Sequence, residues 1–126
     1  MDIPMEWNIT LHDEPRYVEV LTSGVADKDG SLQMTRELIG VMRKNRTTRV
    51  LIDQRGIEKF VGQPRDIHRR PQIMKILGAF LDIRIAEIIK PEFREPFENL
   101  EAVFQSQGFK FRIFESRDDA GKWLFA

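Results

Sequence analysis

The sequence of 126 residues contains no cysteine, so disulfide bonds, thiolate metal ligands and a cysteine nucleophile are excluded. It also lacks an excess of either charge, because 20 Lys and Arg residues balance 20 Asp and Glu residues. Domains that neutralise nucleic-acid phosphates normally gather positive charge. We therefore expect no nucleic-acid ligand for this protein.

A long apolar run is missing as well. A membrane helix needs about 18 or more consecutive apolar residues, and four charged residues interrupt the longest candidate, Ile73 to Ile89. The first seven residues contain two acids and a proline in place of the positive charge and apolar run of a signal peptide. The sequence thus predicts a cytoplasmic protein without a membrane span.

The residues that are present predict one α/β domain spanning positions 1–126. Alternating or continuous apolar residues predict strands at 7–12, 17–21, 50–53, 83–89 and 109–113. Helical spacing, prolines and capping residues predict helices at 30–45, 64–81, 96–107 and 116–124, with a kink or restart of the second one at Pro71. The order ββαβαβαβα predicts a mixed, mostly parallel sheet of about five strands flanked by helices, with the N-terminal strand as an antiparallel edge.

The run Val50-Leu51-Ile52 predicts a strand buried on both faces at the centre of this sheet. We expect the strand to end at Asp53 and a loop to follow at 56–62. We likewise expect the preceding strand to end at Gly24. In open α/β sheets, ligands bind beyond the carboxyl ends of the strands. We therefore predict a binding surface for an anion or an acidic protein partner, with a solvated basic face as the alternative. Its candidate residues are Asp53, Arg55, Gly56, Gln63, Arg65, His68, Arg69 and Arg70.

The wide apolar face of the predicted helix from Ile73 to Leu81 has two interpretations. It packs deeply in the core, as helices that are apolar all round usually do, or it lines a cavity for a small apolar, lipid-like ligand. The candidate residues for such a ligand are Phe60, Ile73, Met74, Leu77 and Phe80.

Patterns for catalysis, metals and cofactors are absent from the sequence. The two histidines, His12 in a predicted turn and His68 in a basic segment, have no further ligands at metal-binding spacing. No nucleophile elbow, phosphate-binding loop or dinucleotide fingerprint occurs. The acids at 92, 95, 98 and 101, with Asp82 and Glu87 nearby, are interpreted as a solvated face. We assign no catalytic residue, metal or cofactor.

Three local patterns and the order of elements resemble the SpoIIAA-like family, which groups STAS domains with Sec14-type lipid-binding folds. The matching residues are Arg49 to Asp53 with Arg55-Gly56, then Arg84-Ile85-Ala86, and finally Phe111 to Phe114 with Ala120 and Trp123-Leu124. In the anti-sigma-factor antagonists of that family, a serine that follows the central strand is switched by phosphorylation. The segment from Asp53 to Gln72 contains no Ser or Thr, so this switch does not carry over.

The resemblance and the missing catalytic groups favour a bacterial, non-enzymatic regulatory module that binds a protein partner through the predicted surface. The alternative is a carrier or sensor of a small apolar ligand. An enzyme with an unfamiliar carboxylate or arginine site is the third hypothesis. We also expect self-association into a homodimer.

Overall fold

The computed structural model describes residues 2–76 and 82–126. Its elements are β1 (Glu6–Asp13), β2 (Arg16–Ala26), α1 (Lys28–Asn45), β3 (Arg49–Phe60), the 3-10 helix η1 (Pro64–Arg69), α2 (Arg70–Ile76), β4 (Arg84–Ile88), the 3-10 helix η2 (Pro91–Phe93), α3 (Arg94–Ser106), β5 (Lys110–Phe114) and α4 (Arg117–Leu124). The predicted order of strands and α-helices is confirmed.

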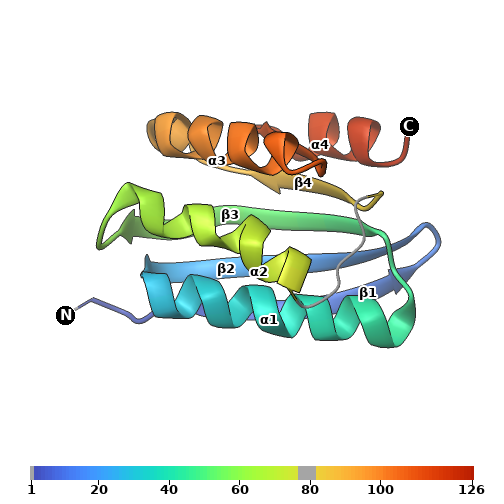
Figure 1. Ribbon diagram of the computed structural model, residues 1–126, viewed down its shortest axis with the longest axis horizontal. Coiled ribbons are helices and arrows are strands. Elements are labelled where there is room, and N and C mark those ends of the chain that lie inside the picture. Colours follow the sequence, from blue (N-terminus) through green and yellow to red (C-terminus); the bar gives the residue numbers. More distant parts are fainter. Residues whose placement is uncertain (1, 77–81) are drawn as a thin grey trace.

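The strands form one five-stranded sheet in the order β1-β2-β3-β4-β5, so β3 is central (Figure 1). β1 pairs with β2 antiparallel, and the remaining neighbours pair parallel. A tight turn at Glu14 and Pro15 joins β1 to β2, since Asp13 pairs with Arg16. His12 therefore lies in β1 and not in the turn, which corrects its predicted position. The mixed sheet with an antiparallel edge agrees with the expectation.

Gly24 was predicted to end β2, but it lies within this strand. Its φ of +84° is a conformation that favours glycine. A Cβ atom at Gly24 would lie 2.3 Å from the Pro4 carbonyl oxygen, because the chain before β1 passes close to β2. This glycine lets β2 continue beside the segment that contains Pro4, whereas the sequence pattern alone suggested that the strand ends there.

β3 likewise continues past Asp53 to Phe60, where a loop was expected. The longer β2 supplies a pairing partner, with Ser23 beside Gly56 and Ala26 beside Phe60. The register shifts twice in this stretch, so β3 contains two irregularities of the bulge type. These bulges break the alternation of apolar and polar residues, and the strand was missed for that reason.

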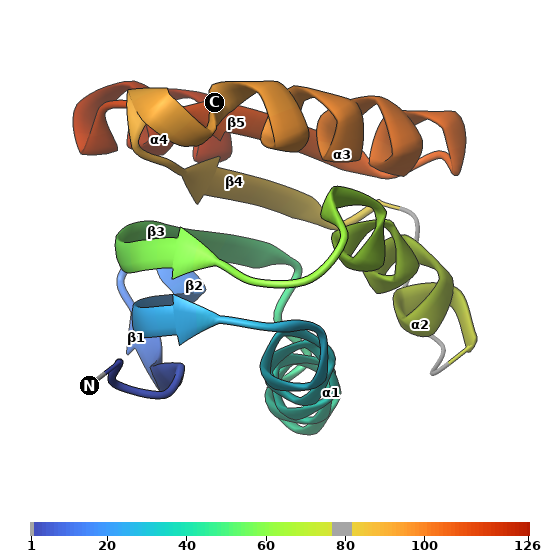
Figure 2. The ribbon, with the colours of Figure 1, turned by 90° about the vertical axis from the view of Figure 1, so that its left-hand side faces the viewer.

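The sheet separates two unequal cores. The larger core packs Val20, Val50 and Ile52 against apolar residues from α1, η1, α2 and α3. The smaller core packs Leu51, Ala86 and Ile88 against Ala120 and Leu124 of α4. Figure 2 shows α1 and α2 on the same side of the sheet. We call this side, with the larger core, face A, and the side that α4 covers face B.

The predicted helix at 64–81 is divided next to Pro71, where a kink or restart was expected. η1 begins at Pro64, and α2 follows directly at Arg70. Met74 is buried, but Ile76 is 81% exposed, so the predicted deep packing around the whole helix is wrong for its described part. Leu77 and Phe80 lie outside the described residues. No helix in the described part of the chain is long and apolar enough to cross a membrane.

Candidate functional site

The structure does not bring the predicted binding residues together on one surface. Asp53 and Arg55 lie on face B, where Arg117 of α4 approaches the Asp53 carboxylate to 3.6 Å. The segment from Gln63 to Arg70 packs on face A through Ile67. The expectation of one shared edge is therefore wrong, because β3 continues past Asp53 and Arg55 to Phe60, and the two groups lie on opposite faces of the sheet.

On face B, Arg55 turns back onto its own strand. Its Nε and Nη2 atoms donate to Asp53 at 2.9 and 2.7 Å, and its backbone N–H donates to the same carboxylate at 3.1 Å. Burial alone would raise the pKa of the Asp53 carboxyl, but these hydrogen bonds and the positive charges of Arg55 and Arg117 lower it below its ordinary value. Asp53 is only 8% exposed. These contacts occupy Asp53 inside the fold.

Glu19 of β2 extends this charged group across face B. It accepts hydrogen bonds from Arg117 and, at 3.1 Å, is paired with His12. Burial alone would raise the pKa of Glu19, but the hydrogen bonds from Arg117 and His12 lower it below its ordinary value. The group joins β1, β2, β3 and α4, so its described contacts are structural.

Arg70 is buried in the interior and is not part of a binding surface, which corrects its prediction. Only 2% of it is exposed, and its guanidinium donates to Glu87 of β4 at 2.7 and 3.0 Å. The Gln54 amide also reaches Glu87, at 3.3 Å, and Thr22 donates to Gln54 at 2.6 Å. Glu87 is fully buried, so its interpretation as a solvated acid is wrong.

The predicted residues that do share one exposed region are Gln63, Arg65, His68 and Arg69. They lie in the turn and in η1, directly beyond the carboxyl end of β3. Arg65 and Arg69 are exposed, and His68 is half-buried. No ion-pair partner for either arginine occurs among the residues that the structure describes. Gly56 lies back within β3, away from this turn.

A hollow of about 290 Å³ lies at the same end of the sheet. Three aromatic residues contribute to its apolar lining: Phe60 at the end of β3 contacts Phe93 and Phe97 edge-on, with ring centres 5.0 and 5.5 Å apart. Ala26, Val61, Ile67 and Pro96 complete this lining. We call the hollow, together with Gln63, Arg65 and Arg69, the carboxyl-edge site.

Polar groups surround the aromatic lining. Asp27 caps α1 by accepting from the Gly30 N–H at 2.7 Å, and Asp66 accepts from the Gln63 N–H at 3.0 Å. Lys28 and Ser31 also line the hollow from the first turns of α1. The arrangement suits the insertion of an apolar group whose neighbours make polar contacts at the opening.

The predicted apolar-ligand residues have different positions. Phe60 lines the hollow, whereas Ile73 and Met74 belong to the larger core. Sequence reasoning missed Phe93 and Phe97, which line the hollow with Phe60. Pro91 and Pro96, which precede them, indicated a loop and a helix start near the end of a strand. The sequence could not show that Phe93 and Phe97 lie next to Phe60, because this depends on tertiary contacts.

The described residues contain no group of three or more His, Asp or Glu side chains placed to hold a metal ion. His12 contacts Glu19 on face B, and His68 belongs to η1 on face A. The two histidines therefore do not act together on one site.

Comparisons with known proteins find similarity of structure only. No family model matches the sequence, and no curated protein matches it. An uncharacterised DUF3478-family protein with a SpoIIAA-like fold from Shewanella loihica is similar at 18% identity and a TM-score of 0.62, over 98% of this chain and 95% of its own. An anti-sigma factor antagonist from Mycobacterium paratuberculosis is similar at 16% identity and a TM-score of 0.66, over 98% and 96%. The chain thus has a SpoIIAA-like fold.

Proposed function

We propose that this SpoIIAA-like domain is a non-enzymatic module that binds a protein segment at the carboxyl-edge site. The observation that carries the proposal is an aromatic hollow lined by Lys28 and by residues of η1, the 3-10 helix that also carries Arg65 and Arg69. These three cations are exposed and have no ion-pair partner in the part of the chain that the structure describes. The fold supports the proposal by analogy with the anti-sigma factor antagonist, which is named as a regulatory protein.

The hollow supplies the apolar part of the contact. Val61, at its edge, is 46% exposed, and the rings of Phe60, Phe93 and Phe97 line its wall. Binding energy at protein interfaces concentrates where one large side chain fills such a pocket and excludes water. The partner segment therefore carries an apolar anchor residue.

The cations beside the hollow define the rest of the partner. Arg65 and Arg69 are exposed on η1, and Lys28 is exposed at the start of α1. No described acidic side chain forms an ion pair with any of the three. Complementary charge raises association rates and selects partners, so we expect acidic residues next to the apolar anchor.

Site-specific photo-crosslinking in the native host tests this proposal. A benzoylphenylalanine placed at Gln63 or at Arg69 should crosslink the same protein, and one placed at Lys110 on the far edge strand should not. The double variant Arg65→Glu/Arg69→Glu should weaken binding of the recovered partner about a hundredfold. The variant Lys110→Glu/Lys122→Glu has the same change in charge and should leave binding unchanged. Equal loss in both variants, or no common crosslinked protein, would contradict the proposal.

A second function rests on the same hollow, whose volume of about 290 Å³ is near the lower limit of small-ligand pockets. In that case a compact apolar ligand, rather than a side chain, fills it. Native mass spectrometry of gently purified protein should then show a retained adduct. The variant Val61→Trp, which fills the opening, should lose the adduct, and an adduct-free wild-type spectrum would exclude this function.

A further inference from the structure

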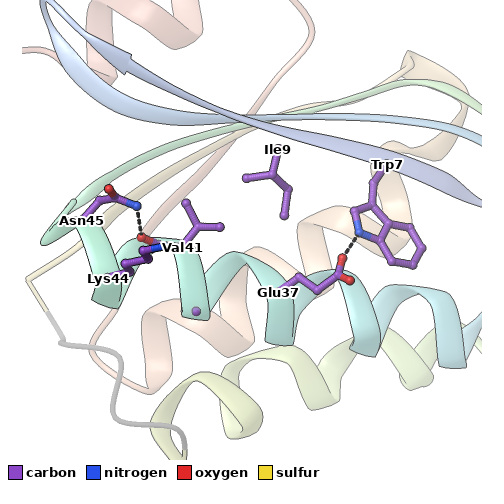
Figure 3. A pocket seen from close by; sticks show the side chains of 7 residues that line it. Trp7, Ile9, Glu37, Val41, Lys44 and Asn45 are labelled. Atoms are coloured by element: carbon purple, nitrogen blue, oxygen red, sulfur yellow. Dashed lines mark hydrogen bonds between the residues drawn. The ribbon is translucent and has the colours of Figure 1, made fainter.

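A second groove lies on the opposite part of face A, between the edge strand β1 and α1 (Figure 3). The volume of this open groove is about 580 Å³. Trp7 and Ile9 of β1 face Val41 of α1 across it, and all three are only half-buried. Glu37 and Lys44 lie at its two ends on α1. The groove is separate from the carboxyl-edge site and has no residue in common with it.

The charges of this groove are arranged symmetrically about its centre. Glu37 accepts a hydrogen bond from the Trp7 indole N–H, which holds the carboxylate at one end. Lys44, seven residues later, is exposed and has no ion-pair partner among the described residues. Seven residues span about 10 Å along a helix, so Glu37 and Lys44 of one chain cannot pair with each other.

Gly40 occupies the middle of α1, where glycine costs about 1 kcal/mol of helix stability relative to alanine. It is exposed, and a Cβ atom at this position would find no atom within 4 Å. Packing within the chain therefore does not require a glycine here. A missing side chain at the centre of a groove allows another backbone to approach closely.

We propose that this groove is an isologous interface, in which α1 of a second copy of the chain packs antiparallel against α1 and β1. A twofold axis midway between Gly40 and Val41 places Glu37 opposite Lys44 of the second copy, and Lys44 opposite its Glu37. In this arrangement, α1 of each copy covers Trp7 and Ile9 of the other copy. A twofold interface must be complementary to itself. This face meets that condition in charge, and Gly40 next to the axis leaves room for the two helices to approach closely.

The test is the monomer–dimer equilibrium, measured by sedimentation velocity over a series of concentrations. Glu37→Lys and Lys44→Glu should each weaken dimerisation about tenfold or more, because each creates two like-charged pairs per dimer. The combined variant Glu37→Lys/Lys44→Glu exchanges the charges and should restore the affinity to within about threefold of wild type. Gly40→Gln should abolish the dimer while the monomer stays folded, since the site is open and Gln favours helix over Gly.

Two further measurements link the dimer to this groove. In a Trp123→Phe background, emission from Trp7 should shift to shorter wavelength as the dimer forms. Control reversals away from the groove, Glu58→Lys and Lys110→Glu, should leave the equilibrium unchanged. A wild type that stays monomeric up to about 1 mM, a concentration equivalent to about 4 kcal/mol, would overturn the proposal. A dimer whose affinity is unchanged by the Gly40 and charge variants would also overturn it. So would a shift in Trp7 emission that appears only when a different protein is added.

Discussion

Arg70 and Glu87 form a buried, bidentate ion pair that fixes the first residue of α2 to the central part of β4. The guanidinium donates to both carboxylate oxygens, and the side chains are 3% and 0% exposed. The same guanidinium lies 5.7 Å from the ring centre of Phe104, and its Nε atom has no hydrogen-bond partner among the described residues. Because η1 leads directly into α2, this pair also holds the exposed arginines of η1 at the carboxyl edge.

Removal of one member of this pair should destabilise the protein strongly. Arg70→Met leaves the Glu87 carboxylate buried without its cation, at an expected cost of about 3–5 kcal/mol in the free energy of unfolding. Urea denaturation monitored by circular dichroism measures the change. Arg70→Met/Glu87→Leu removes both charges and should recover most of the loss. A single variant that loses less than about 1 kcal/mol would show that the pair is not needed for stability.

The fold was predictable because its signals are periodic and local. Val50 to Ile52 is apolar throughout, as a central parallel strand requires, and helix starts such as Asp27 and Ser116 carry their own capping groups. Glu87 also carried a signal that was not used. A lone acid within the apolar stretch from Ile83 to Ile89 lies in a doubly buried strand and therefore needs a buried cation.

The candidate site was predictable only in part. Gln63, Arg65 and Arg69 could be assigned to the carboxyl edge from the end of the central strand, and they are found there. The sequence does not reveal which face each side chain of β3 occupies, because the bulges change the alternation and their positions depend on pairing with β2. It also does not reveal that β3 continues to Phe60, so Asp53 and Arg55 were predicted at the end of the strand although they lie within it.

Two glycines should respond in opposite ways to the same substitution. A Cβ atom at Gly56 would lie 2.2 Å from the Thr22 carbonyl oxygen, so Gly56→Ala forces β2 and β3 apart and should cost about 1–3 kcal/mol. Gly40→Ala meets no neighbour and should stabilise α1 by about 0.5–1 kcal/mol. Thermal unfolding of dilute protein measures both, and a shift of the same sign in both variants would contradict the structural assignment.

The cap of α4 should contribute measurably to the smaller core. The Ser116 hydroxyl accepts from the Asp119 N–H at 3.3 Å, and α4 carries Ala120 and Leu124 into that core. Ser116→Ala should lower the free energy of unfolding by about 1 kcal/mol. Ser23→Ala, an exposed position on β2, is the matched control and should change it little. Equal effects from the two substitutions would show that the cap is not stabilising.

The charged group on face B should make stability depend on pH in the acid range. The pKa values of Asp53 and Glu19 are lowered in the folded protein from ordinary values of 3.8 and 4.5. A carboxyl whose pKa is lower in the folded than in the unfolded state stabilises the fold fully above the unfolded value, and this contribution disappears as the pH falls through the folded value. Stability should therefore be constant with respect to these groups at neutral pH and decline below about pH 4.5.

Arg117 isolates this effect, because it contacts both carboxylates from α4. Arg117→Gln should be less stable than wild type at pH 7, and the difference should shrink as the pH falls through the ordinary values of 4.5 and 3.8 towards the lowered pKa values of the folded protein. Lys122→Gln removes a cation from the same helix that has no partner among the described residues, and it should show no such convergence. Urea unfolding at a series of pH values provides the comparison. A difference between Arg117→Gln and wild type that does not shrink as the pH falls below these ordinary values would mean that Arg117 acts through packing and not through the two carboxylates.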